Sequence, residues 1–392
     1  MNSFFFASTP HIHFGSGIRS KLPDIIRSYG AKVLFVTGGN SFDDSGLCQQ
    51  LWADLQREFD IHRIRVSGEP SPQLVDAAVA QYKTFSPDCV VAVGGGSVVD
   101  AAKAIAGLLP TGDSVMLYLE GVGKGKVFQG PSTPFVALPT TAGTGGETSK
   151  NAVLSEIGVN GFKKSFRHDE LVARHIILDA DLSLSCPKPV TAACGMDALT
   201  QLLESYVSAK ANVMTDALAI SGLEKVRDSL IAAVDDGTNL QAREGMLYAS
   251  SMSGLTLANA GLGSVHGLAS PLGAFFPMPH GEVCGTLLYE AVRINIRAMQ
   301  QREPANPALV KYAEAGRLFG RDATLNDNAA QEELLQVLKQ WTACLAMPSL
   351  SAYGVKAADF DRIIDNISGG SIATNPIVLS RQEITELLSS RL

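Results

Sequence analysis

Runs of apolar residues alternate with amphipathic segments along the first half of the chain. β-branched and aromatic runs predict strands over residues 4–14 (a strand or hairpin), 31–36, 61–66, 90–93, 134–138 and 174–179. Apolar positions at helical spacing predict helices over residues 18–29, 48–59, 72–85 and 97–105. This alternation is typical of a mostly parallel sheet covered on both faces, with ligands at the carboxyl ends of its strands.

The pattern changes near residues 183–189, where two prolines precede a long region of helical periodicity. The helices predicted in this region cover residues 191–207, 214–234, 242–260, 263–275, 282–298, 306–318, 331–345 and 357–367. We therefore predict an α/β domain with a Rossmann-like parallel sheet over residues 1–183. An all-helical domain is predicted over residues 184–392.

Three glycines and a serine, Gly94 to Ser97, connect the strand at 90–93 to the helix that follows it. Consecutive glycines let backbone N–H groups approach an anion, and Ser97 adds a hydroxyl donor or caps the helix. The start of the helix also presents the positive end of its dipole. The turn favours a nucleotide pyrophosphate. Because its pattern is not G-x-G-x-x-G, a plain structural turn remains the alternative.

A second loop, residues 139–149, follows the strand at 134–138 and is dense in hydroxyl groups and glycine. Its composition suits a second wall of a nucleotide site. On composition alone, a loop that caps a helix fits as well. In a parallel sheet both loops would lie at the carboxyl edge.

One set of polar residues in the helical half has the chemistry of a metal site. Asp197 and Gln201 lie four residues apart, so they project from one face of a helix whose other residues nearby are apolar. A buried carboxylate there requires a cationic partner, and His266 and His280, each set among Gly or Pro, are the candidates. Together these donors would suit Fe(II), Zn(II) or Mn(II). The alternative is that the histidines are hydrogen-bonded core residues.

The composition narrows the class of function. The chain has 392 residues, 46% of them hydrophobic, and a net charge of −7 without basic clusters, which argues against a nucleic-acid partner and favours small-molecule chemistry. Its six cysteines include no Cys-x-x-Cys pair, as expected for reduced thiols in a cytosolic protein and not for a zinc ribbon. We find no signal peptide or long apolar span, so we expect a cytoplasmic protein with no membrane partner.

Five short motifs follow one another along the chain, at residues 94–103, 139–147, 195–200, 261–267 and 279–281. In this order and spacing they resemble the iron-containing (group III) alcohol dehydrogenase family, and the similarity covers essentially the whole chain. The resemblance implies a dehydroquinate synthase-like fold with a nicotinamide cofactor and a divalent metal in a cleft between two domains. It also implies a homodimer.

The resemblance implies roles for individual residues. The pyrophosphate would be held by Gly95, Gly96 and Ser97. Other cofactor contacts are implied for Gly38, Asp100, Thr140, Thr141, Thr144, Ser149, Lys164 and Leu178. The predicted metal ligands are Asp197, Gln201, His266 and His280, of which the two histidines are also the candidate catalytic residues.

Three positions depart from the family pattern. Gln201 stands where a histidine ligand normally follows the aspartate by four residues, and an amide oxygen binds borderline metals more weakly than imidazole does. Ser270 stands where another histidine usually lies near the nicotinamide, so a candidate proton shuttle is missing. Gly38 replaces an aspartate that NAD-preferring members often carry, so no carboxylate there repels the 2′-phosphate of NADP(H).

We predict an oxidoreductase that transfers a hydride between NAD or NADP and an alcohol, aldehyde or ketone, with weakly held Fe²⁺ or Zn²⁺ as Lewis acid. The altered ligand set leaves open a metal-independent reductase similar to the maleylacetate reductases. A lyase similar to dehydroquinate synthase is another alternative, although such an enzyme would be expected to bring more basic residues to its substrate phosphate. A cofactor-binding sensor without turnover is the third.

Overall fold

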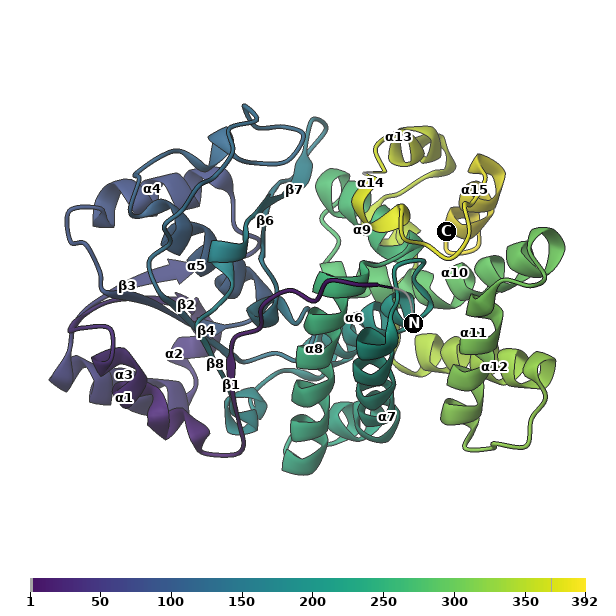
Figure 1. Ribbon diagram of the computed structural model, residues 1–392, viewed down its shortest axis with the longest axis horizontal. Coiled ribbons are helices and arrows are strands. Elements are labelled where there is room, and N and C mark those ends of the chain that lie inside the picture. Colours follow the sequence, from purple (N-terminus) through teal and green to yellow (C-terminus); the bar gives the residue numbers. More distant parts are fainter. Residues whose placement is uncertain (1–2, 368) are drawn as a thin grey trace.

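The computed structural model describes residues 3–367 and 369–392, and it consists of a half built on a sheet and a helical half side by side (Figure 1). The last strand of the sheet, β8 (His175–Leu178), is followed by a 3₁₀ turn and then by the first long helix, α6 (Lys188–Val207). The predicted domain boundary after residue 183 falls within this transition and stays a prediction. The predicted fold class is confirmed.

The main sheet has six parallel strands in the order β1-β8-β5-β4-β2-β3. Besides β8, its strands are β1 (His11–Phe14), β2 (Lys32–Gly38), β3 (Asp60–Val66), β4 (Cys89–Gly94) and β5 (Phe135–Pro139). The central strand β4 pairs with β2 on one side and with β5 on the other. The chain order reverses at β4, so the carboxyl ends of these three strands form the switch point at which such sheets bind ligands.

Helices cover both faces of this sheet. They are α1 (Leu22–Arg27), α2 (Asn40–Asp43), α3 (Gly46–Glu58), α4 (Pro72–Tyr82) and α5 (Gly96–Leu108). One apolar core lies between the sheet and helices α4 and α5, and a second lies between the sheet and helices α1 and α3. The strands β4 and β5 are buried throughout, which explains why they appear in the sequence as continuous apolar runs.

Two features of this half differ from the sequence-based expectation. The predicted strand at 4–14 is paired only over β1, and the segment before it runs along the helical half, where Ala7 N donates to Asn259 Oδ1 at 2.7 Å. An antiparallel hairpin of β6 (Asn151–Glu156) and β7 (Phe162–Arg167) was not predicted.

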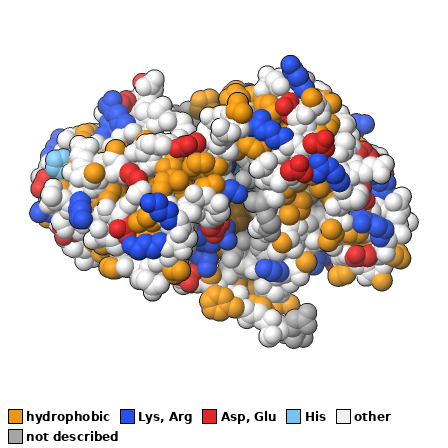
Figure 2. Space-filling model, turned by 90° about the horizontal axis from the view of Figure 1, so that it is seen from above, with side chains coloured by type: hydrophobic (Ala, Val, Ile, Leu, Met, Phe, Trp, Pro, Cys, Tyr) orange, Lys and Arg blue, Asp and Glu red, His pale blue; other side chains and the backbone are white. Residues whose placement is uncertain are grey.

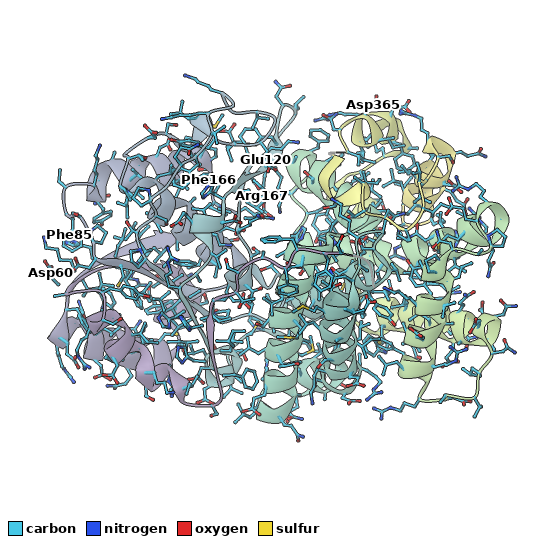
Figure 3. All side chains as sticks on the ribbon, viewed as in Figure 1. Asp60, Phe85, Glu120, Phe166, Arg167 and Asp365 are labelled. Carbon is cyan, nitrogen blue, oxygen red and sulfur yellow. The ribbon has the colours of Figure 1, made fainter. Side chains whose placement is uncertain are left out.

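The hairpin is anchored through its apolar side chains. Phe166 is buried and packs against Tyr118 and Phe128, with ring centroids 5.4 and 5.1 Å away. The next residue, Arg167, points the other way and pairs with Glu120 at 3.5 Å (Figure 3). This alternation of buried and exposed side chains is that of a strand with one covered face.

The second half contains only helices and short 3₁₀ turns among the described residues. After α6 come α7 (Val213–Asp235), α8 (Leu240–Ala260), α9 (Ser264–Phe275), α10 (His280–Arg302), α11 (Pro307–Gly320), α12 (Asp327–Cys344), α13 (Phe360–Asp365), α14 (Gly369–Ile372) and α15 (Arg381–Ser389). The predicted helix at 357–367 is in fact a 3₁₀ turn followed by α13, and α10 begins two residues before its predicted start.

Acidic and basic side chains are interspersed over the face seen in Figure 2, which is hollowed between the two lobes. Within the described parts of the chain, no helix is both long and apolar enough to cross a membrane.

The sheet half and the helical half pack backbone against backbone at Gly145 and at Gly254 on α8. A Cβ added to Gly145, whose φ is +58°, would lie 2.3 Å from Ser250 O and 2.5 Å from Gly254 N, both on α8. Gly145→Ala is therefore expected to lower the free energy of unfolding by about 2–4 kcal/mol, through left-handed strain and overpacking. Urea unfolding measures this loss.

The matched control is Gly125→Ala. Gly125 also has positive φ, +70°, but no atom lies within 4 Å of its added Cβ. Its loss should be about 1–2 kcal/mol, from backbone strain alone. If both variants lost the same free energy of unfolding, the contact between Gly145 and α8 would contribute nothing to stability.

Candidate functional site

The glycine turn lies at the switch point of the sheet, where β4 ends and α5 begins. Gly95 is the N-cap of α5 in an extended conformation, and Gly96 is its first helical residue. A Cβ added to Gly95 would lie 3.1 Å from Thr141 Oγ1, and one added to Gly96 would lie 3.0 Å from Thr144 Oγ1. The structure therefore brings the glycine turn and the threonine-rich loop face to face, as the sequence predicts for two walls of one site.

Lys103, on α5, holds the second loop in place. Its buried Nζ donates to the carbonyl oxygens of Gly146, Ser149 and Asn151 at 2.7, 2.9 and 2.5 Å. Burial lowers the pKa of Lys103 to about 8, against the attraction of Asp100. Burial likewise raises the pKa of Asp100 to about 6, against the attraction of Lys103. Ser149 thus contacts this internal lysine, whose charge also acts on Asp100, and the predicted contacts of both residues with a cofactor stay predictions.

The remaining predicted cofactor residues occupy different places. Thr140 N donates to the carbonyl oxygen at the end of β4, and Ser97 lies in the first turn of α5. Leu178 is buried at the end of β8, on the same edge of the sheet. Lys164 lies on β7, and a Cβ added to Gly121 would lie 4.0 Å from its Nζ.

Two arginines that the sequence analysis did not consider lie near Gly38, the last residue of β2. Arg63 and Arg65 lie on the neighbouring strand β3, and Arg65 is aligned with Thr37. Both guanidinium groups contact Asp43, at 2.7 and 2.9 Å. One carboxylate between two guanidinium groups leaves a surplus positive charge at this corner of the sheet.

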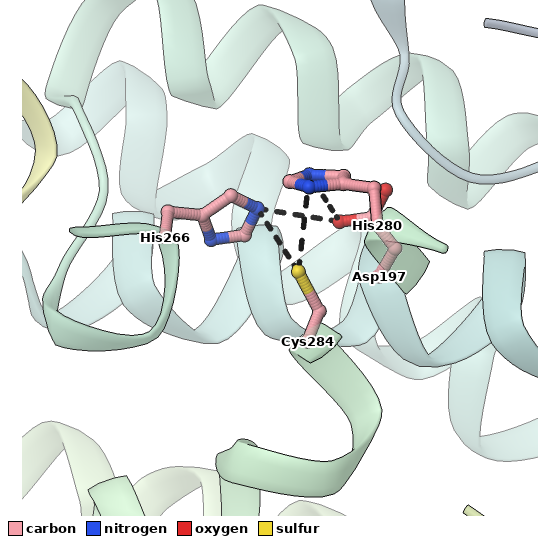
Figure 4. Close-up of side chains that lie close together, drawn as sticks. All are labelled: Asp197, His266, His280 and Cys284. Atoms are coloured by element: carbon pink, nitrogen blue, oxygen red, sulfur yellow. Dashed lines mark hydrogen bonds and ion pairs between the residues drawn. The ribbon is translucent and has the colours of Figure 1, made fainter. Parts of the chain in front are cut away.

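In the helical half, three helices bring Asp197 on α6, His266 on α9 and His280 on α10 together (Figure 4). His266 Nε2 lies 3.2 Å from Asp197 Oδ1, and His280 Nε2 lies 3.7 Å from the same oxygen. The side chains of Asp197 and His266 are 2% and 6% exposed, whereas that of His280 is 25% exposed. The centre is therefore buried but open on the side of His280.

The fourth member of this cluster is Cys284, which the sequence analysis missed. It lies one turn after His280 on the same face of α10, and its Sγ lies 3.6 Å from His266 Nε2 and 3.8 Å from His280 Nε2. The four potential ligand atoms of Asp197, His266, His280 and Cys284 all lie within 4.8 Å of one another. A carboxylate, two imidazoles and a thiol are donors that divalent transition metals accept, so the residues fit the predicted metal.

The predicted ligand Gln201 lies beside this cluster. Its Nε2 is 3.4 Å from Asp197 Oδ1, and its Oε1 accepts a hydrogen bond from Ser253 at 2.9 Å. Ser253 Oγ is in turn 3.5 Å from the carbonyl oxygen of Gly143, in the threonine-rich loop. This chain of contacts joins the cluster to the predicted cofactor site. Ser270, at the other departure from the family pattern, donates to the Lys163 carbonyl at 3.0 Å.

Glu204 orients His266. The two residues lie on α6 and α9, and Glu204 Oε2 lies 2.7 Å from His266 Nδ1, while Glu204 Oε1 accepts from Val265 N at 2.7 Å. A carboxylate on one ring nitrogen leaves the other nitrogen to bind a metal, an arrangement that is common among metal-binding histidines. His280 Nδ1, by contrast, is buried with no hydrogen-bond partner in the described structure.

The electrostatics of the cluster favour a negatively charged Asp197 beside a positively charged His266. Burial opposes the charge of Asp197, but the two imidazoles outweigh it and hold the pKa of Asp197 below its usual range. Burial also opposes charge on His266, and the neighbouring Cys284, Asp197 and Glu204 raise its pKa well above the usual value. Burial lowers the pKa of His280 to about 4 and raises that of the Cys284 thiol to about 12.

Comparisons with known proteins agree with this site. Residues 9–180 match the iron-containing alcohol dehydrogenase family, and residues 191–392 match the C-terminal region of the Fe-containing alcohol dehydrogenase family. A 1,3-propanediol dehydrogenase of Klebsiella pneumoniae is 33% identical over 374 residues, which are 91% of this chain and 90% of that protein.

Solved structures show the same fold. A crystal structure of a 1,3-propanediol oxidoreductase has a TM-score of 0.89 at 29% identity and matches over 100% of both chains. The structure of a sulfoacetaldehyde reductase from Bifidobacterium kashiwanohense in complex with NAD⁺ has a TM-score of 0.83 at 27% identity, over 100% of this chain and 99% of that chain.

The two family matches cover the sheet and the helical half in turn, and they favour the predicted dehydrogenase over the lyase, the metal-independent reductase and the sensor. The resemblance and the predicted oxidoreductase activity are confirmed. The chain belongs to the iron-containing alcohol dehydrogenase family and is a nicotinamide-dependent alcohol oxidoreductase.

Proposed function

We propose that this enzyme interconverts a small alcohol and its aldehyde or ketone with NADP(H) at a divalent metal held by Asp197, His266 and His280. The observation that carries the proposal is the convergence of these three side chains, from three helices, on one buried centre. The metal would supply Lewis acidity toward the substrate oxygen. We further propose that the ion is Fe²⁺ or Zn²⁺. The enzyme is also proposed to be a homodimer and to act in the cytoplasm.

The residues around this centre would position the reactants. Glu204 fixes the ring of His266, and Gln201 donates to Asp197, so both side chains are held by hydrogen bonds before any ligand arrives. The opposed walls at Gly96 and Thr144 would hold the pyrophosphate of the nucleotide, with the start of α5 directed toward it. The contacts through Ser253 and Gly143 connect the two parts of the site.

Absorbance of the reduced nicotinamide with a panel of alcohols and aldehydes tests this proposal, on protein as purified, stripped by a chelator and reloaded with metal. We expect net turnover that is lost with the metal and restored with it. Undiminished turnover in metal-free protein would instead assign the chain to a metal-independent reductase mechanism. Nucleotide binding without net oxidation would favour a lyase or a sensor.

The preference for NADP(H) rests on the corner of the sheet at Gly38. No carboxylate occupies the end of β2, and the surplus charge of Arg63 and Arg65 lies on the next strand. Gly38→Asp is expected to shift the ratio of kcat/KM values toward NAD(H) roughly 10–100-fold, since a charge-assisted hydrogen bond gained or a repulsion introduced is worth about 1.5–3 kcal/mol. Steady-state kinetics with both cofactors measures the shift.

Arg65→Ala is the complementary variant. The Arg65 side chain is 64% exposed, so its expected contribution is only about 1 kcal/mol, or roughly fivefold in the KM for NADP(H). The KM for NAD(H) should stay unchanged. A wild-type enzyme that strictly excludes NADP(H) would refute this preference while leaving the metal site and the alcohol chemistry in place.

A further inference from the structure

We propose that Cys284 is the fourth protein ligand of the metal, and that it binds as a thiolate. This inference rests on the metal site of the proposed function and concerns the place left by the histidine that the family normally has at position 201. Cys284 follows His280 by four residues, so α10 presents both side chains to Asp197 and His266.

The spacing of the four potential ligand atoms fits a single bound ion. Ligands about 2.0–2.3 Å from a tetrahedral zinc ion lie about 3.3–3.8 Å from one another. Four of the spacings in the cluster are 3.2 Å (Asp197 to His266), 3.7 Å (Asp197 to His280), 3.6 Å (Cys284 to His266) and 3.8 Å (Cys284 to His280). All six spacings are within 4.8 Å, so side-chain shifts on the order of 1 Å would surround the ion.

Gln201 is less well placed for the same role. Its amide oxygen accepts a hydrogen bond from Ser253, and it is the amide nitrogen that faces Asp197. A ligating oxygen would require rotation of the amide, which would exchange the oxygen beside Ser253 for the nitrogen. Cys284 requires no such rotation, since its Sγ already lies between the two imidazoles.

A thiolate changes the chemistry of the site. Together with Asp197 it brings two negative charges, which balance those of a divalent ion, and binding of the ion displaces the thiol proton of Cys284. Sulfur is a soft donor, so this ligand set favours zinc or cobalt over manganese or magnesium. The site thereby differs from one completed by an amide oxygen, which would favour harder ions.

Spectroscopy of the metal-loaded full-length protein tests the assignment without an activity assay. The Co²⁺-substituted wild-type protein should show a near-ultraviolet sulfur-to-cobalt charge-transfer band, and X-ray absorption of the Zn²⁺ form should show sulfur at about 2.3 Å. Cys284→Ser should lose both signals, and its Kd for Zn²⁺, measured by chelator competition, should rise at least about 100-fold. Cys344→Ser, which alters an exposed cysteine outside the cluster, should retain them.

Gln201→Ala separates the two candidate ligands, because it should keep the charge-transfer band. A band that persists in Cys284→Ser, or an unchanged Kd in that variant, would overturn the assignment. A wild-type site that binds Zn²⁺ through nitrogen and oxygen alone would overturn the thiolate but leave the proposed function intact. A wild-type protein that binds no metal would overturn both.

Discussion

His266→Ala is expected to abolish metal binding and to lower kcat/KM roughly 1,000-fold, on the order of 4 kcal/mol. His266 uses both ring nitrogens in the cluster, since it faces Asp197 and Cys284 through Nε2 and Glu204 through Nδ1. Its removal takes away a ligand and also leaves the buried carboxylates of Asp197 and Glu204 without the imidazole that lies between them. Metal analysis after purification, together with turnover, measures the effect.

The same loss of contacts is expected to destabilise the protein, so a second variant separates folding from chemistry. His266→Gln keeps an amide that can donate to Glu204, and it should therefore unfold closer to wild type while its metal content stays low. His62→Ala, at an exposed histidine on β3, should change neither metal content nor turnover. Full activity in a metal-free His266→Ala would leave His280 as the leading candidate for a proton donor.

The architecture was predictable where local sequence decides it. The buried strands β4 and β5 are continuous apolar runs, and the glycines that end β4 mark the turn into α5 without any knowledge of the rest of the fold. The hairpin β6–β7 escaped notice because its second strand is mostly polar, and only Phe166 is buried on it. Its place is set by packing against distant aromatic side chains, which the sequence does not display.

Three residues of the candidate site could be predicted from the sequence, but the side chains that contact them could not. Asp197, His266 and His280 stand out as isolated polar residues in apolar or Gly/Pro-rich surroundings, and the structure brings them together. Cys284 escaped because the predicted helix started at 282 and left His280 outside it, which hid the four-residue spacing. The signal was present, and a helix beginning at His280 would have shown it.

Residues that act across elements could not be found from sequence. Arg65 lies near Gly38 only because β3 pairs with β2 in parallel register, and neither the pairing nor the register is encoded locally. Glu204 follows Asp197 by seven residues on α6, and this spacing of two turns predicts that both side chains lie on the same face of the helix. Its partner His266 lies 62 residues away along the chain, and only packing of α6 against α9 reveals that contact.

Gly96→Val is expected to weaken binding of NAD(P)(H) at least about 100-fold, or roughly 3 kcal/mol. A Cβ at this position lies 3.0 Å from Thr144 Oγ1 and 3.1 Å from its Cγ2, so a branched side chain pushes the threonine-rich loop away from the turn. It also fills the space through which a pyrophosphate reaches the backbone N–H groups at the start of α5. Fluorescence titration with the reduced nucleotide measures the loss.

Gly46→Val is the matched control for this prediction. Gly46 is the first residue of α3, as Gly96 is of α5, but no atom lies within 4 Å of its added Cβ. Both substitutions place a β-branched residue at the start of a helix in the same domain, so they share any cost of helix propensity. Only Gly96→Val should lose the nucleotide, while unfolding of both variants stays cooperative. A folded Gly96→Val protein with wild-type affinity would show that the turn at β4 is structural and that the nucleotide binds elsewhere.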